Sequence, residues 1–458
     1  MKLSKRKVEH LIQEYNSFTY DELVNSGENL PFKLKPSYIN KKSIEIFMAL
    51  VKENINETLN IYKKHKISYK GKIYLLPDFY ALSGIPIQVK DKFIFKFLFD
   101  KNPDFKRKFE DKYNKILTKH LFLKGLSFAS TFLIFIVITL FLSLKIICYG
   151  PSLKARNIFV STFLETGALK FIPSLIMSDK EINEIVNKNG LLEFNEDVDT
   201  SKVEIDVKEE NKDEIEIKKV YGNNFFGTLM IVHDPSRVKL ATTYPFTKYG
   251  KELNEIVKLN DAIGAVNGGL YESIGNHGGY PVGVVVSNEQ IQYNSPYGKG
   301  YYLIGFDTDN KLRILSMEGL NTDGVVNLVK KEKIRDAVTF QEEYSDANNH
   351  FVKLIVNGEN RKTTGLGSGA NPRTAIGQRA DGTVLLLVTD GRGISGHLGA
   401  TASDLIDVMS KNGAINAANI DGGSSSSMYY NGEYLMTSVT LYYSNSSWRL
   451  PDAFIVTK

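Results

Sequence analysis

Two Asp-Gly pairs in this chain have the residue types and the setting that catalysis requires. Asp390 begins the motif DGRG and Asp421 begins DGGSSSS, and each follows a run of apolar residues typical of a buried strand. Glycine after such a strand permits a tight turn and a close approach of the backbone to a ligand. A carboxylate held at the end of a strand has the fixed direction that proton transfer needs. One such pair is usually only a turn, so the two matter together with the residues around them.

Residues suited to binding phosphate accompany both pairs. Arg392 follows Asp390 closely, and Arg373 lies in NPRTAIG just before another apolar run. A guanidinium presents a planar fork that matches phosphate oxygens, and successive glycine N–H groups form an anion-binding nest. The expected substrate- or phosphate-binding residues are therefore Arg373, Arg392, Asn267, Gly268, Gly269, Gly422, Gly423 and Ser424.

The candidate catalytic residues are Asp421 and Asp390, with Glu272 and His397 as lesser candidates. An alternative interpretation is that the arginines and aspartates form structural ion pairs, and both interpretations can hold together. Zinc is not expected, because no two histidines have the spacing of metal ligands and the chain has 1 cysteine. The metal requirement is left unknown, with calcium held by Asp and carbonyl oxygens as an open possibility.

The elements that must position these residues are short strands and helices beyond residue 220. Period-two and apolar runs predict strands, and residues 403–411 have helical spacing. Strands arranged around helices indicate an α+β (mixed α/β) domain with a mixed β-sheet and packed helices. The strands are predicted at residues 282–287, 301–306, 312–315, 352–356, 374–378, 383–388 and 415–420.

The ordered motifs resemble the phosphodiester glycosidase family over roughly residues 220–458. The order is VNGGLY (266–271), NPRTAIG (371–377), VTDGRG (388–393), NIDGGSSSSM (419–428), and a terminal R-x-P-x-A-x-x-V pattern from Arg449 to Val456. Two departures are Leu270-Tyr271 after NGG, and Ser424 where a third glycine is usual. The resemblance implies hydrolysis of sugar-1-phosphodiesters at the C1–O bond. A non-catalytic glycan-binding or wall-regulating module on the same fold is the alternative, and an active cytoplasmic part is a third possibility.

A membrane helix precedes this domain. Residues 125–144 contain 20 residues without a charge, enough for a helix that crosses a bilayer. Residues 1–124 hold 25 Lys+Arg against 14 Asp+Glu, so the positive-inside rule predicts a cytoplasmic N-terminus and an extracellular C-terminal domain. The same topology accounts for the basic N-terminal region without nucleic acid as a partner.

The predicted organisation has five parts. They are a cytoplasmic region of unknown function (1–120), a transmembrane helix (121–149), a juxtamembrane helical stalk (150–192), an acidic linker (193–219) and the glycosidase-like domain (220–458). The expected protein is a bacterial single-pass membrane hydrolase acting on a phosphodiester-linked glycan or cell-wall polymer, with the lipid bilayer as its other partner.

Overall fold

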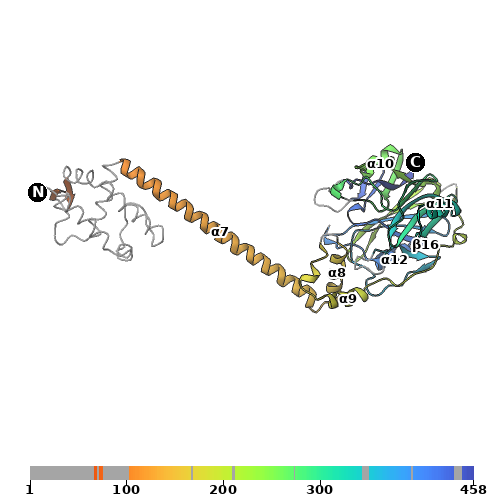
Figure 1. Cartoon of the computed structure of the whole chain (residues 1–458), viewed down its shortest axis with the longest axis horizontal. Coiled ribbons are helices and arrows are strands. Elements are labelled where there is room, and N and C mark those ends of the chain that lie inside the picture. The colour runs from red at the N-terminus through yellow and green to blue at the C-terminus, as the bar shows by residue number, and fades with distance from the viewer. Residues whose placement is uncertain are drawn as a thin grey trace. The chain divides into compact units, whose positions relative to one another are not determined.

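The computed structural model describes residues 66–69, 72–75, 103–166, 169–208, 212–272, 274–342, 350–393, 396–437 and 446–458 (Figure 1). The chain divides into one unit of residues Met1–Leu140 and another of Phe141–Lys458. The described part of the first unit contains a hairpin of β1 (Lys66–Tyr69) and β2 (Lys72–Leu75), followed by most of helix α7 (Pro103–Tyr149). A helical pattern at residues 43–64 lies outside the described residues.

Helix α7 contains the predicted membrane segment. Its part Thr118–Tyr149 contains an 18-residue stretch with a mean hydropathy of 2.6, and this part is long and apolar enough to cross a bilayer. Hydrophobic side chains such as Phe128, Leu133 and Phe135 are exposed on it. Exposed side chains of this kind are unfavourable in water, so the segment differs from a buried core helix.

Three antiparallel sheets form the second unit. The largest has the order β13-β12-β16-β14-β15-β4-β3, and the others have the orders β10-β9-β11-β7-β8 and β18-β17-β6-β19-β5. The largest comprises β3 (Ile215–Tyr221), β4 (Phe226–Val232), β12 (Lys353–Val356), β13 (Glu359–Asn360), β14 (Thr374–Arg379), β15 (Val384–Thr389) and β16 (Ala414–Ile420).

The other two sheets have five strands each. The first consists of β7 (Val284–Ser287), β8 (Gln290–Asn294), β9 (Tyr301–Asp307), β10 (Leu312–Ser316) and β11 (Ile334–Gln341). The second consists of β5 (Val238–Thr242), β6 (Ala262–Asn267), β17 (Met428–Tyr430), β18 (Glu433–Met436) and β19 (Asp452–Thr457). The α+β prediction is confirmed. All described pairings between adjacent strands are antiparallel, so the fold is mixed in combining helices with antiparallel sheets.

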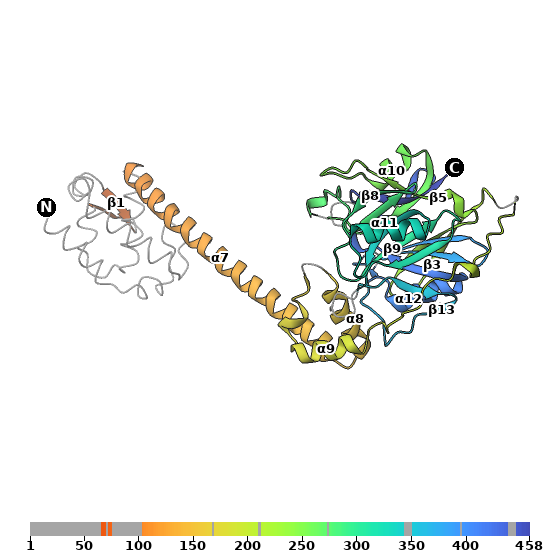
Figure 2. The same cartoon turned by 45° about the vertical axis from the view of Figure 1, so that its right-hand side comes forward.

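The main core lies where the three sheets face one another, and helices cover their outer faces. In β15, Leu386 packs into the shared core, whereas Leu385 packs on the opposite face with α12 (Ala402–Lys411). Burial on both faces explains why β15 reads as the uninterrupted apolar run VLLLV. Helices α10 (Leu253–Leu259) and α11 (Thr322–Lys331) cover the two five-stranded sheets, and Figure 2 shows where α10, α11 and α12 lie on the unit.

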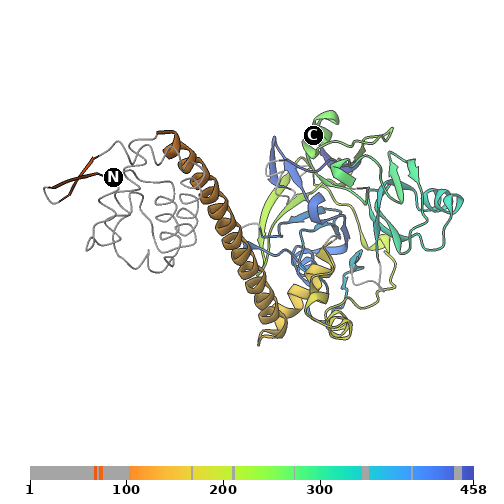
Figure 3. The same cartoon turned by 60° about the vertical axis from the view of Figure 1, so that its left-hand side comes forward.

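The segment after α7 folds against the sheets. Helices α8 (Leu153–Leu164) and α9 (Asp179–Asn187) share a small core with the end of α7, which includes buried Cys148. Ser178 and Glu181 form the predicted capping box of α9. The side chain of Thr162 accepts a hydrogen bond from the Ala370 amide at 3.0 Å, and Figure 3 shows α8 against the strands. The segment predicted as a stalk thus contacts the domain directly.

The segment predicted as an acidic linker is also bonded to the domain where it is described. The Glu204 amide donates to the Ala380 carbonyl at 2.9 Å, and Val203 is buried. Strand β3 begins at Ile215 and pairs with β4, so the predicted boundary at Val220 falls inside a strand. The acidic side chains mark this segment's solvent-facing side, while its backbone hydrogen bonds tie it to the sheet.

Candidate functional site

The strand order brings distant motifs to one edge of the largest sheet. Strand β14 pairs antiparallel with both β15 and β16, and Thr374 lies opposite both Val388 and Ile420. Strands β15 and β16 therefore run in the same direction on either side of β14, connected by the crossover helix α12. Their carboxyl ends meet beside the amino end of β14, where Asp390, Asp421 and Arg373 leave the sheet.

Asn267 connects this edge to the neighbouring sheet. Its Nδ2 donates to the Asp421 carbonyl at 2.7 Å, and its Oδ1 accepts from Thr374 Oγ1 at 2.7 Å and from the Ser427 amide at 3.2 Å. The side chain is fully buried. Its hydrogen-bonding groups are used within the protein, so the geometry supports a positioning role rather than the predicted contact with substrate.

Asp390 and His397 form a dyad at the end of β15. Asp390 Oδ1 accepts from the Phe226 amide at 2.7 Å, and its Oδ2 lies 2.6 Å from His397 Nδ1. Asp390 is buried, whereas 30% of the His397 side chain is exposed. A carboxylate bound at Nδ1 fixes the imidazole tautomer and leaves Nε2 as the proton acceptor. Asp390 therefore orients His397, which is the dyad's accessible base.

Arg392 extends toward the loop after β16. Its backbone adopts a left-handed conformation (φ 54°), and its Nη1 donates to Ser424 Oγ at 2.7 Å. A Cβ on Gly423 would lie 2.7 Å from Arg392 Nη2, so glycine is needed there for close approach. Removal from water and the positive charge of Arg373 lower the pKa of Arg392, while the negative charge of Asp421 raises it. Both cations and this carboxylate thus act on one another electrostatically.

Asp421 has an environment suited to proton transfer near neutral pH. Removal from water raises its pKa to about 7, against the opposing effects of hydrogen bonds from Ser425 and the Gly422 amide and of the charge on Arg392. A group that titrates near the working pH serves as an efficient acid or base. Among the predicted carboxylates, Asp421 is the one whose pKa shift supports that role.

Arg373 is held by a residue that sequence reasoning missed. Its Nη2 pairs with Glu165 Oε2 at 2.5 Å, and its guanidinium lies 5.0 Å from the centre of the Phe351 ring. Glu165, at the end of α8, also accepts from the backbone amide of Gly369 (2.5 Å) and from Asn371 Nδ2 (3.1 Å). Glu165 is the single acidic residue between Gly150 and Met177. An isolated carboxylate in an apolar segment was the available signal for a buried partner.

Asp452 is a second missed carboxylate. It starts β19, and its Oδ1 accepts from the Gly269 amide at 2.8 Å. Burial and the nearby charge of Asp421 raise its pKa to about 7. Its other oxygen, Oδ2, is buried without a hydrogen-bond partner. The residue lies within the terminal R-x-P-x-A-x-x-V pattern, which was the signal in the sequence.

Tyr271 completes this side of the edge. Its hydroxyl lies 2.9 Å from Ser425 Oγ. Burial raises the pKa of Tyr271, and the charges of Asp421 and Asp452 act in the same direction. The phenol therefore stays protonated and can donate a hydrogen bond. The departure from the family pattern at this position puts a polar group beside Asp421.

The glycines serve mainly to let protein segments pack closely. A Cβ on Gly268 would lie 2.0 Å from Asp452 Oδ1. The amide of Gly269 bonds to Asp452, and the amide of Gly423 bonds to the Pro372 carbonyl at 2.8 Å. The N–H groups of Gly422 and Gly423 thus have acceptors within the protein, Asp421 and the Pro372 carbonyl, and their binding of an anion stays a prediction.

The remaining predictions concern Glu272 and a bound metal. Glu272 is exposed, and its amide bonds to the Tyr280 carbonyl at 2.9 Å. Within the described ranges, no hydrogen bond or ion pair joins its side chain to Asp421 or Asp390. Also within those ranges, no group of three or more His, Cys, Asp or Glu side chains is arranged to hold a metal.

Comparisons with known proteins agree with the motif order. A family model described as phosphodiester glycosidase matches residues 260–457. The SPbeta prophage-derived uncharacterized protein YomE of Bacillus subtilis (strain 168) is 43% identical over 65 residues, which are 14% of this chain and only 10% of that protein's length.

Two solved structures are similar at low sequence identity. One is the zebrafish N-acetylglucosamine-1-phosphodiester alpha-N-acetylglucosaminidase catalytic domain auto-inhibited by its pro-peptide, with TM-score 0.40, 19% identity, and coverage of 54% of this chain and 82% of that one. Another is a hypothetical protein from Synechocystis, with TM-score 0.33, 16% identity, and coverage of 53% and 61%.

The family model begins near β6 and extends into β19, and it contains all of the motifs that meet at the sheet edge. Residues 260–457 therefore match the phosphodiester glycosidase family.

Proposed function

We propose that this protein is a membrane-anchored, extracytoplasmic hydrolase that cleaves the glycosidic bond of sugar-1-phosphodiesters in cell-surface glycans. The observation that supports the proposal is the proximity of Arg392 and Asp421 at one sheet edge, a cation suited to phosphate and a carboxylate with a pKa of about 7. The family match of residues 260–457 supports the reaction class, and the apolar part of α7 supports the anchor.

The chemistry follows from the positions of these groups. Arg392 and Ser424 neutralise the phosphate, which makes it a good leaving group. Asp421 takes a proton from water as the water oxygen bonds to C1 and the bond from C1 to the phosphate oxygen breaks. His397, oriented by Asp390, is a second group for proton transfer. Arg373 is already neutralised by Glu165, so Arg392 is assigned the phosphate.

The test is a release assay on a panel of hexose- and N-acetylhexosamine-1-phosphodiesters. The panel includes N-acetylglucosamine-1-phosphodiesters because the zebrafish enzyme is named for them. Asp421→Asn and Arg392→Ala should each lower kcat/KM by about 10²–10³. The melting temperature should stay close to that of the wild type.

Asp407→Asn is a matched control, because Asp407 lies on α12 with 59% of its side chain exposed. Its activity should equal that of the wild type. Binding of a phosphodiester glycan without any release of sugar would contradict the enzyme proposal and favour the glycan-binding module.

A further inference from the structure

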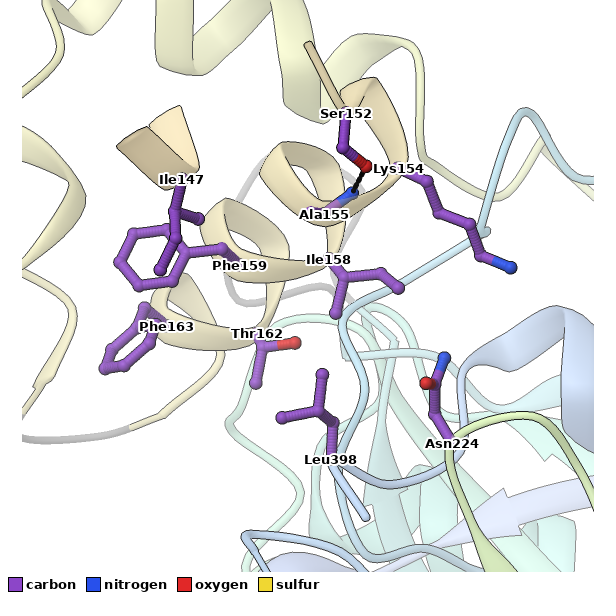
Figure 4. A pocket seen from close by; sticks show the side chains of 10 residues that line it. All are labelled: Ile147, Ser152, Lys154, Ala155, Ile158, Phe159, Thr162, Phe163, Asn224 and Leu398. Carbon is purple, nitrogen blue, oxygen red and sulfur yellow. Dashed lines mark hydrogen bonds between the residues drawn. The ribbon is translucent and has the colours of Figure 1, made fainter. Parts of the chain in front are cut away.

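A largely apolar cavity of about 450 Å³ lies between α8 and the loops of the glycosidase domain. Figure 4 shows Ile147, Phe159 and Phe163 grouped on one side of it, and Asn224 and Leu398 on another. The other lining residues are Ser152, Lys154, Ala155, Ile158 and Thr162. The volume is that of a site for a small organic ligand or part of a larger one.

The cavity and the candidate active site share a loop. Leu398 directly follows His397, and its carbonyl accepts from the Arg392 amide at 3.1 Å. The Asn224 carbonyl accepts from the Gly399 amide at 2.8 Å. One wall of the cavity is therefore formed by the loop that carries the His397 base and the Arg392 cation.

The other wall is formed by α8 and by Ile147 near the end of α7. Ile147 lies in α7, two residues before the end of the Thr118–Tyr149 segment. Leu398 is 43% exposed and Ala155 is also exposed, so the apolar lining is accessible. Accessible apolar surface is stabilised by apolar contact rather than by water. If α7 spans the bilayer, the cavity lies next to the membrane surface.

Two cationic side chains indicate where the phosphate of such a ligand would bind. Arg392 provides the cation on the active-site side, and Lys154 provides one at the cavity. A phosphodiester has two ester groups, so a sugar can occupy the site around Asp421 while the second ester group extends past Leu398. Both cationic side chains suit a phosphate group as a binding partner.

We propose that the cavity between α8 and the 390–399 loop binds the alkyl or isoprenyl chain of a lipid-linked sugar-1-phosphodiester. Hydrolysis then adds water to the sugar C1 and releases the lipid as its phosphomonoester. This inference rests on the proposed function and names the substrate class of that same site. The apolar chain holds the substrate at the site, and the chemistry is that of Arg392 and Asp421.

The experiment compares methyl and dodecyl esters of the same sugar-1-phosphate as substrates of the full-length protein in nanodiscs. Burial of one methylene is worth about fourfold in affinity, and ordering of the chain offsets part of this gain. The dodecyl ester should therefore have a kcat/KM at least about tenfold above that of the methyl ester. Ala155→Phe, which places a ring in the cavity, should reduce this ratio to about one.

Leu175→Phe is the matched control, because Leu175 is 59% exposed and lies outside the cavity lining. It should keep the wild-type ratio, which separates binding in the cavity from partition of the dodecyl ester into the bilayer. Equal kcat/KM values for the two esters, or a preference that survives in Ala155→Phe, would overturn the inference and leave the proposed function intact. Hydrolysis of neither ester would overturn the proposed function and this inference with it.

Discussion

At the scale of single residues, the site is defined by how each charge is partnered. Asp390 is committed to the Phe226 amide and His397, and Arg373 is committed to Glu165. We therefore propose Arg392 and Asp421 as the pair that acts on the substrate. Residue type alone did not distinguish these roles, because all four side chains follow or precede apolar runs.

Loss of Glu165 should destabilise the domain. Its side chain is 3% exposed and pairs with an arginine that is itself only 12% exposed. Removal of one partner from a buried ion pair typically costs about 3–5 kcal/mol. Glu165→Ala should lower the free energy of unfolding by about 3 kcal/mol in chemical denaturation. Glu184→Ala, on the exposed face of α9, should change it by less than about 0.5 kcal/mol. Equal effects of the two variants would exclude the Glu165–Arg373 pair as a stabilising contact.

Stability should depend on pH through Asp421 and Asp452. Both have a pKa of about 7, against 3.8 for an unperturbed aspartate. Between these values the folded state holds protons that the unfolded state has lost, so this contribution to stability declines as pH rises toward and through 7. Asp452→Asn removes one of the two groups. The free energy of unfolding of this variant, relative to the wild type, should therefore rise between pH 5 and pH 8. A constant difference across that range would contradict the raised pKa of Asp452.

At the scale of elements, the domain needs more chain than its motifs suggest. Strand β3 forms the edge of the largest sheet beside β4, and α8 supplies Glu165 to the site. Both lie before residue 222 and outside the matched family range. The segment between the apolar helix and the sheet thus contributes both a strand and a buried charge.

A truncation series tests this organisation. A fragment of residues 150–458 retains α8, α9 and β3, and it should unfold cooperatively. A fragment of residues 220–458 loses most of β3, which exposes the edge of β4, and it leaves Arg373 without Glu165. Exposed strand edges promote aggregation, so the shorter fragment should aggregate or show no cooperative transition. If both fragments unfold with the same midpoint, residues 150–219 form an independent linker as the composition suggested.

At the scale of the whole molecule, the distribution of charge predicts how the chain is oriented in a membrane. The net charge of +5 combines a basic segment before the apolar helix with an acidic remainder. We expect the basic flank to stay in the cytoplasm and residues 150–458 to lie outside. The proposed lipid-linked substrate fits this arrangement, because its apolar chain and the anchor of the enzyme share one bilayer.

Protease protection measures that topology. Protease added to intact cells should remove epitopes placed near the C-terminus and leave an N-terminal epitope intact. Lysis should expose both epitopes to the protease. A C-terminal epitope that is protected in intact cells and lost only on lysis would reverse the orientation and remove the extracytoplasmic location from the proposed function.

The sequence by itself determined several of the helices and strands and identified the motifs that contain the candidate residues. Local signals were sufficient for β15, an apolar run, and for β16, a mostly apolar one, because glycines bound both. They were also sufficient for α9, because Ser178 and Glu181 cap it. The family resemblance came from motif order. These are properties of contiguous residues, and short-range sterics and burial patterns express them directly.

The tertiary structure decided which groups face one another. The insertion of β14 between β15 and β16 brings Asp390 and Asp421 to one edge across 31 positions of sequence, and no local pattern encodes that order. Glu165 meets Arg373 across 208 positions, and Asp452 meets Gly269 across 183. Their pKa values and pairings depend on burial and on distances set by packing, so they follow from the folded chain rather than from the spacing of residues along it.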